Sequence, residues 1–149
     1  MATVSLPPDF KEFLKLLNKH QVDYLLIGGY AVAYHGYPRA TADMDIWIRL
    51  DTQNANRIVA ALKEFGFKHS SLSTELFLKE GRVIRMGVPP VRIEICTTIS
   101  GVSFEECYKA RITDVLDEVE VSLINLPHLK INKKASGRHK DLADLENLP

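Results

Sequence analysis

The stretch YLLIGGYAVAYHGYPRATADMDIWI, residues 24–48, decides how this chain is expected to fold. Residues 24–27 form an apolar run that predicts a buried strand, and the pair Gly28-Gly29 ends that run. Residues 30–35 then have the composition of a short helix. Residues 43–48 are again rich in apolar side chains and predict a second strand.

The second predicted strand carries two acids on one face. Side chains alternate along a strand, so Asp43 and Asp45 lie on one face while Met44, Ile46 and Ile48 lie on the other. Two neighbouring carboxylates repel each other unless water or a cation offsets their charge. The apolar neighbours argue for burial, which favours a cation, and magnesium suits oxygen ligands that leave room for phosphate and water. The plainer alternative is an exposed edge strand with two solvated acids.

The pair Gly28-Gly29 is suited to bind an anion next to those acids. Glycine permits close backbone approach, and free amides at the start of a helix favour an anion. The pair could also be a simple tight turn between strand and helix. Neither G-x-G-x-x-G nor G-x-x-x-x-G-K-[ST] occurs, which counts against a dinucleotide site or a P-loop. The glycine turn and the paired acids together predict a site that binds a phosphate beside a divalent metal.

A third acid is expected on a neighbouring hairpin. Residues 81–86 and 91–95 have the pattern of two strands joined by a turn. The apolar side chains of the second strand share one face, so Glu94 lies on the opposite face. It is predicted to bind metal or to act as the base that takes the acceptor's proton. The alternative is a salt bridge to Arg92 or Arg85.

The C-terminal part carries a cluster of cations. A strand is predicted over residues 118–126, followed by helix over residues 127–145, either one helix broken near Gly137 or two short helices. The cluster comprises Lys130, Lys133, Lys134, Arg138, His139 and Lys140. Its plainest interpretation is a solvated basic face near a helix end.

These motifs carry a family resemblance. Gly28-Gly29, the helix that follows and Asp43-x-Asp45 resemble the signature of the nucleotidyltransferase superfamily that shares the DNA polymerase β-like catalytic core. The fuller string Arg39-x-Thr41-x-Asp43-x-Asp45 resembles its small bacterial members, which include antibiotic nucleotidyltransferases and AbiEii-type toxins. The resemblance extends over nearly the whole chain. It implies an α/β (α+β) minimal nucleotidyltransferase fold, a mixed β-sheet with helices packed against it, as a single domain over residues 1–149.

The resemblance also implies a reaction, which is magnesium-dependent transfer of a nucleoside monophosphate (NMP) from a nucleoside triphosphate (NTP) to an acceptor hydroxyl, with release of pyrophosphate. Asp43 and Asp45 would hold two magnesium ions, and Glu94 stands where the family commonly carries Asp. Lys133 is the counterpart of a residue that contacts nucleotide phosphates.

Six other residues receive supporting roles. Gly28 and Gly29 would help Lys133 to hold the triphosphate, while Arg39 and Thr41 either organise the site or are loop residues that steady the carboxylates. Asp141 and Asp144 are expected to orient the C-terminal cations.

Composition limits the possible classes of protein. The 149 residues, 46% of them hydrophobic, suffice for one domain with a single core. Lys and Arg total 19, as do Asp and Glu, so the net charge does not indicate tight binding of nucleic acid. A local basic patch is still compatible with this balance. Two cysteines outside any C-x-x-C pair predict neither a disulfide framework nor a zinc site. Without a signal-peptide core or a membrane-spanning run, a cytoplasmic protein that does not enter membranes is expected.

Several alternatives stay open at this stage. The acceptor could be RNA, protein or a small molecule, and a second copy of the chain could complete the cleft. The rival class is a non-catalytic module that keeps the fold and binds nucleotide or a partner protein, for example in a toxin–antitoxin system. The three acids argue against this rival, while the lack of room for a separate acceptor domain keeps it open.

Overall fold

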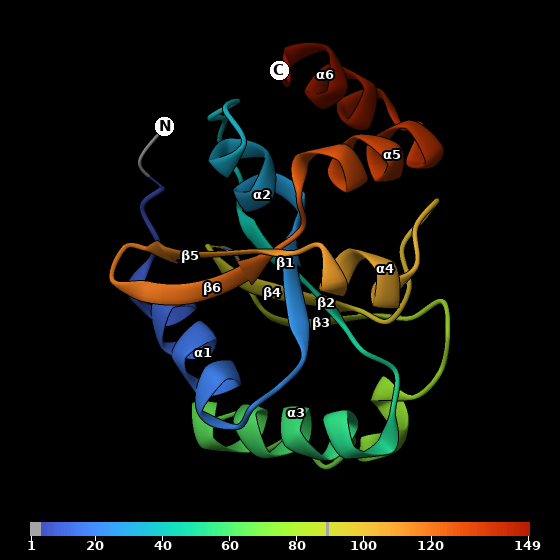
Figure 1. The fold of residues 1–149 in the computed structure, drawn as a ribbon. Coiled ribbons are helices and arrows are strands. Elements are labelled where there is room, and N and C mark those ends of the chain that lie inside the picture. The colour runs from blue at the N-terminus through green and yellow to red at the C-terminus, as the bar shows by residue number, and fades with distance from the viewer. Residues whose placement is uncertain (1–3, 89) are drawn as a thin grey trace.

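A computed structural model describes residues 4–88 and 90–149, and within them a six-stranded mixed sheet lies between two groups of helices (Figure 1). The strands are β1 (Tyr24–Ile27), β2 (Asp43–Ile48), β3 (Val83–Val88), β4 (Val91–Cys96), β5 (Ile112–Leu116) and β6 (Val119–Leu123). The helices are α1 (Pro8–Lys19), α2 (Gly28–Tyr34), α3 (Thr52–Phe65), α4 (Phe104–Lys109), α5 (Leu126–Ser136) and α6 (His139–Asn147), with a 3₁₀ turn η1 (Thr74–Phe77). The expected mixed sheet with packed helices is confirmed.

The alternation of side chains along β1 and β2 gives the sheet two apolar faces. Leu26 and Ile46 belong to the core that α1 and α3 cover. Leu25 and Trp47 belong to a second core, which α2, α4 and α5 cover on the opposite face (Figure 1). The predicted acids of β2 therefore lie on the same face as Trp47, next to the second group of helices.

The strand order β3-β4-β2-β1-β6-β5 brings the charged positions together. β2 runs antiparallel to β1, with Asp45 opposite Ile27. β2 runs parallel to β4, and Asp45 pairs in register with Glu94. Across the hairpin, Glu94 pairs with Arg85 of β3. One row of side chains across three strands thus holds two acids and one arginine on the same face.

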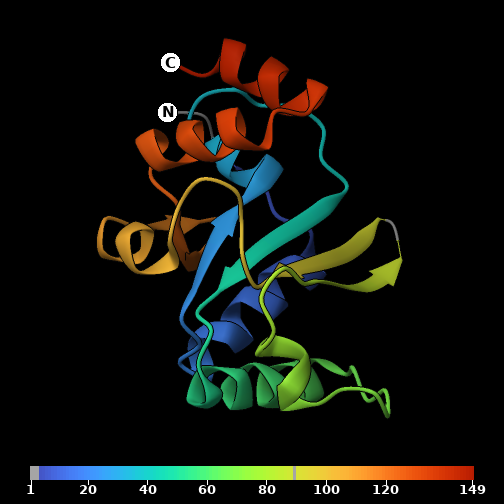
Figure 2. The ribbon, with the colours of Figure 1, turned by 90° about the vertical axis from the view of Figure 1, so that its right-hand side faces the viewer.

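The predicted hairpin is confirmed as β3 and β4, which project from the edge of the sheet (Figure 2). The strand predicted over residues 118–126 is shorter, and it pairs with β5, which the sequence analysis did not predict. Of the two C-terminal alternatives, two helices are present. Gly137, at φ 67°, ends α5 in the left-handed conformation that glycine adopts easily.

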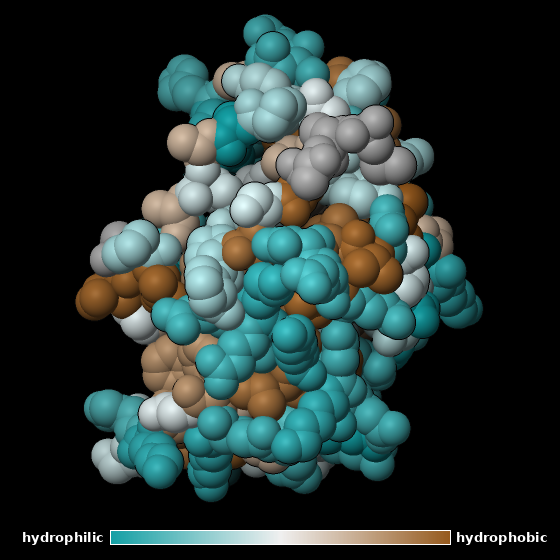
Figure 3. All heavy atoms as spheres, turned by 90° about the vertical axis from the view of Figure 1, so that its left-hand side faces the viewer, coloured by the Kyte–Doolittle hydropathy of each residue, from teal (hydrophilic) through white to brown (hydrophobic). Residues whose placement is uncertain are grey.

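The surface has little contiguous apolar area on the face that Figure 3 shows, where brown patches are separated by hydrophilic side chains. The exposed large apolar residues among those described are Val83, Val88, Val115, Ile131 and Leu142. No helix in the described ranges is both long and apolar enough to cross a membrane.

Candidate active site

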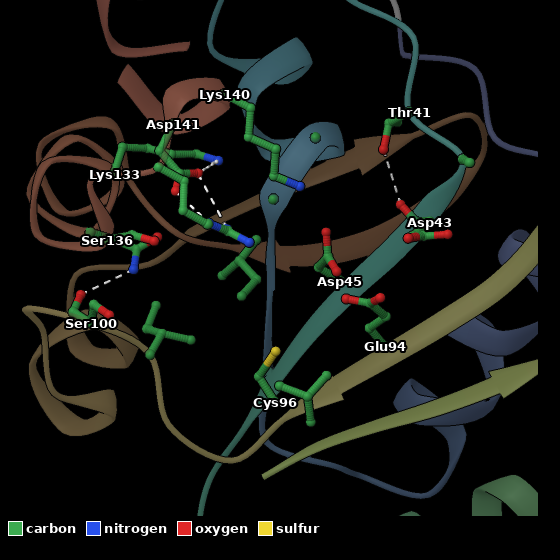
Figure 4. A pocket seen from close by; sticks show the side chains of 18 of the residues that line it. Thr41, Asp43, Asp45, Glu94, Cys96, Ser100, Lys133, Ser136, Lys140 and Asp141 are labelled. Carbon is green, nitrogen blue, oxygen red and sulfur yellow. Dashed lines mark hydrogen bonds and ion pairs between the residues drawn. The ribbon is translucent and has the colours of Figure 1, made fainter. Parts of the chain in front are cut away.

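All eight residues proposed from the sequence line one cavity of about 540 Å³, on the face of the sheet that carries the acids. They are Gly28, Gly29, Arg39, Thr41, Asp43, Asp45, Glu94 and Lys133. The cavity lies between β2, β4, the glycine turn and the two C-terminal helices (Figure 4). Residues up to 105 positions apart in the sequence therefore meet in one place.

Asp45 and Glu94 form the centre of the cavity. Their carboxyl groups point toward each other from adjacent strands (Figure 4). Burial raises the pKa of Asp45, and the nearby Glu94 and Asp43 carboxylates raise it further, to about 7. The position therefore favours either a proton or a bound cation.

Two arginines neutralise the other acids. Arg92 donates two hydrogen bonds to Asp43, from Nε at 3.0 Å and from Nη2 at 2.8 Å. These bonds lower the pKa of Asp43 despite opposition from burial. Arg85 Nε donates to Glu94 Oε1 at 2.9 Å, so the salt bridge considered for Glu94 is present.

These ion pairs bear on whether magnesium fits. Within residues 4–88 and 90–149, no three His, Cys, Asp or Glu side chains stand in the arrangement of a ready-made metal site. The donor set nevertheless fits magnesium chemically, because three carboxylates line the same cavity and Asp45 lacks an ion pair with any described cation. To bind the metal, Asp43 would have to release Arg92, and Glu94 would have to release Arg85.

The glycine turn packs directly against the acid-bearing strand. A Cβ built on Gly28, at φ 66°, would lie 2.8 Å from Asp45 Cγ. A Cβ on Gly29 would lie 2.5 Å from Thr41 Oγ1. Thr41 in turn donates from Oγ1 to the carbonyl oxygen of Asp43 at 3.2 Å (Figure 4). Close approach therefore requires a glycine at both positions, and the positive φ of Gly28 is a second reason at that position.

Arg39 and Lys133 belong to a buried ion network. Arg39 turns away from the acids of β2 and donates to Asp144, from Nε at 2.6 Å and from Nη2 at 2.8 Å. Lys133 Nζ lies 3.1 Å from Asp144 and 3.2 Å from Asp141. The contacts expected of Asp141 and Asp144 with the cations are thus present, whereas Arg39 does not contact the carboxylates of β2.

Burial distinguishes Lys133 from the rest of its cluster. Lys133 is only 4% exposed, so the interpretation of a solvated basic face is wrong for this residue. Burial alone would raise the pKa of Asp141, but hydrogen bonds from Arg138, Ser136 and Lys133 outweigh it and lower the pKa to about 2.

The structure adds residues that the sequence analysis did not assign to the site. Lys140 reaches from α6 toward Asp45 (Figure 4). Further lining residues include Arg85, Arg92, Cys96, Ser100, Asn132, Ser136 and Arg138. The two hairpin arginines had a usable signal, since each lies on a strand face that points to the cavity. For Lys140 there was no such signal, because nothing in the sequence distinguishes it from the neighbouring C-terminal cations. The lining residue Cys96 is not a candidate nucleophile, since burial raises the pKa of its thiol to about 12.

Comparisons with solved structures give the same fold. A nucleotidyltransferase-like antigenic protein from Paracoccidioides brasiliensis matches with a TM-score of 0.56 and 18% identity, over 97% of this chain and 77% of its own. A putative nucleotidyltransferase from Thermotoga maritima matches with a TM-score of 0.63 and 14% identity, over 92% of this chain and 88% of its own. The expected minimal nucleotidyltransferase fold is thereby confirmed.

The comparison with family models covers almost the entire chain. A search of curated protein sequences found no match. The sequence model of the aminoglycoside-2''-adenylyltransferase family, however, matches residues 9–148. The chain therefore belongs to the aminoglycoside-2''-adenylyltransferase family, within the nucleotidyltransferase superfamily.

Proposed function

We propose that this protein transfers an NMP from an NTP to an acceptor hydroxyl in a magnesium-dependent reaction that releases pyrophosphate. The observation that carries the proposal is that Asp43, Asp45 and Glu94 line one cavity beside the Gly28-Gly29 turn, where neither glycine leaves room for a Cβ atom. Family membership supports nucleotidyl transfer in general.

Each group has a role in this reaction. Asp43 and Asp45 would hold two magnesium ions, which when bound supply positive charge to the phosphates and lower the pKa of the acceptor hydroxyl. The amides at the start of α2, which has no side-chain cap, would bind the triphosphate together with Lys133 and Lys140. Lys133 has a third proton beyond the two that face Asp141 and Asp144.

The chemical step is a displacement at the α-phosphorus. The acceptor oxygen forms a bond to this phosphorus, while the bond to the bridging oxygen of the leaving pyrophosphate breaks. Glu94 lies beside Asp45 and can take the proton that the acceptor hydroxyl loses. The family's description names an aminoglycoside as acceptor, while RNA or protein are the other candidates for this chain.

The ion pairs of Asp43 and Glu94 favour a second candidate function. A module that never loads metal could keep both acids paired with arginine and bind nucleotide without transferring it. This is the non-catalytic alternative. It differs from the enzyme in a measurable way, since it would bind NTP but form no product.

Incubation with magnesium and each α-labelled NTP, in the presence of an aminoglycoside, cellular RNA or protein, tests the proposal. We expect label on one acceptor class, and none with Asp43→Asn or Asp45→Asn. Asp9→Asn, which removes an exposed acid on α1, is the matched control and should retain transfer. Transfer that survives in both site variants would refute the assignment of these acids, and nucleotide binding without any transfer would favour the non-catalytic module.

A further inference from the structure

The sheet presents three rows of side chains on the face that carries the acids, and only two of them are charged. The row of Asp43 and the row of Asp45 hold the three acids and both arginines of the hairpin. In the next row, Cys96 pairs with Trp47 on one side and with Val83 on the other. Cys96 and Val83 line the cavity, so its wall becomes uncharged about 7 Å beyond the row of Asp45.

The cavity continues past this uncharged row into an end that the loop after β4 and helix α5 enclose. Figure 4 shows Cys96 and Ser100 on this side, away from Thr41. Arg138, which also lines the cavity, is ion-paired with Asp141. The neutral end of the cavity consists of Cys96, Thr98, Ile99, Ser100 and Asn132.

The neutral end is already formed, because the loop is fixed to α5. Asn132 Nδ2 donates a hydrogen bond to the carbonyl oxygen of Ser100 at 3.0 Å. A Cβ built on Gly101, at φ 82°, would lie 2.6 Å from the Cβ of Ala135, so loop and helix are in close contact. Within the described residues, Asn132 Oδ1 and the second proton of Nδ2 have no hydrogen-bond partner.

An uncharged end suits only part of what this cavity would bind. Magnesium and the triphosphate bind through charge, aminoglycosides are polycations and RNA is a polyanion. The base and ribose of an NTP carry no charge. Asn132 directly precedes Lys133 on α5, so a triphosphate held by Lys133 would place its nucleoside within reach of the same helix.

The unused groups of Asn132 also match one base better than another. An amide offers an acceptor and a donor side by side, and this pair is complementary to N6 and N7 of adenine. Guanine presents two acceptors, O6 and N7, at the same edge, so it would oppose the amide oxygen. A single amide with a fixed direction can therefore discriminate between the two purines.

We propose that the neutral end is the nucleoside subsite and that Asn132 determines base specificity, with its amide paired to N6 and N7 of adenine. Ile99 and Cys96 supply apolar surface beside the ring. This inference rests on the proposed function, because it takes the triphosphate to lie at the start of α2 and on Lys133.

Calorimetric titrations with magnesium test the subsite without catalysis. The probes are α,β-methylene-ATP, α,β-methylene-GTP and tripolyphosphate, which has the phosphates but no nucleoside. The wild type should prefer the ATP analogue by about 10-fold, and Asn132→Leu should lose about 10-fold in affinity for that analogue alone. Tripolyphosphate affinity should change less than about 2-fold, because Asn132 does not contact the phosphates.

The matched control is Asn147→Leu. Asn147 is exposed on α6, and its Nδ2 also donates to a backbone carbonyl, that of Ala143 at 2.8 Å, but it does not line the cavity. This variant should change the affinity for each probe by less than about 2-fold. Asn132→Leu also removes the bond to Ser100, so a displaced loop would weaken both analogues equally. Equal losses for the two analogues, or an equal loss for tripolyphosphate, would overturn the proposal.

A change in the ligand tests the same contact in the unaltered protein. 7-Deaza-ATP lacks the N7 acceptor and should bind about 5-fold more weakly than ATP when no acceptor is present. Equal affinity for the two would overturn the pairing with N7. Transfer from ATP and GTP at equal rates would refute this inference while supporting the proposed function, whereas a preference for the ATP analogue without any transfer would do the reverse.

Discussion

Asp45 and Asp43 lie two residues apart on one strand, yet their surroundings shift their pKa values in opposite directions. Burial and the neighbouring carboxylates raise the pKa of Asp45 to about 7 from an ordinary value of 3.8. The hydrogen bonds from Arg92 lower that of Asp43. The same substitution at the two positions should therefore change the stability of the metal-free protein with opposite sign.

Asp45→Asn should stabilise the metal-free protein at pH 8. Below pH 3.8 the Asp45 carboxyl is protonated in both the folded and unfolded states, so it causes no penalty. Between pH 3.8 and about 7 the unfolded state loses its proton first, so the free energy of unfolding falls as pH rises, by up to about 4 kcal/mol. Asn removes this loss. Urea unfolding in chelator at pH 4.5 and pH 8 measures the difference.

Asp43→Asn is the matched control for that measurement. Its pKa is depressed, so its stabilising pairing with Arg92 is present above the ordinary value and lost as pH falls through the folded pKa. The variant should therefore be less stable than the wild type at pH 8, and the difference should shrink toward low pH. If both variants shift stability in the same direction at pH 8, the electrostatic description of the acid cluster is wrong.

Glu94 can be tested by separating activity from stability. Its ion pair joins a carboxylate that is only 17% exposed to an Arg85 side chain that is 59% exposed, and solvent around the arginine limits the contribution of the pair to about 1 kcal/mol. As a base, however, it would be worth about 10²–10⁴ in rate. Glu94→Gln should thus leave urea stability nearly unchanged and reduce transfer by about 100-fold or more, while Glu94→Asp keeps most activity. A fully active Glu94→Gln variant would leave only the salt-bridge role.

At the scale of elements, the start of α2 and the loop before β2 are fitted to each other. Gly29→Ala would put a Cβ within 2.5 Å of Thr41 Oγ1 and displace the residue that bonds to the Asp43 carbonyl. Overpacking of this kind destabilises by about 1–3 kcal/mol, and the displaced strand end should also impair transfer. Thr41→Gly/Gly29→Ala, which removes the opposing side chain, should recover part of the lost stability in a double-mutant cycle. Additive losses in that cycle would show that the two residues do not interact.

The elements near the site were predictable because their patterns are local. Alternation along residues 43–48 placed Asp43 and Asp45 on one face, and the same rule placed Glu94 on the hairpin. β5 was missed because it is a short edge strand of which only one of five residues is buried, with both Thr113 and Val115 exposed. The contact of Arg39 with Asp144 was also missed, since it joins positions 105 residues apart and leaves no local signal.

At the scale of the whole molecule, one ion network joins the loop before β2 to the two C-terminal helices. Arg39 precedes β2, whereas its partner Asp144 belongs to α6, and Lys133 of α5 lies between Asp144 and Asp141. These contacts hold both C-terminal helices over the cavity. The position of Lys133 and Lys140 relative to the acids therefore depends on packing that spans most of the chain.

Lys133→Ala should then have two separate effects. Removing one partner of a buried ion pair leaves charge poorly compensated, so unfolding free energy should fall by about 3 kcal/mol. If the remaining Lys133 proton contacts the triphosphate, binding of a non-hydrolysable NTP with magnesium should also weaken, by about 1.5–3 kcal/mol in calorimetric titrations well below the unfolding midpoint. Lys134→Ala, an exposed cation of the same helix, should change both quantities by less than about 0.5 kcal/mol. A loss of stability with unaltered NTP affinity would make Lys133 a positioning residue for the C-terminal helices and leave Lys140 as the phosphate contact.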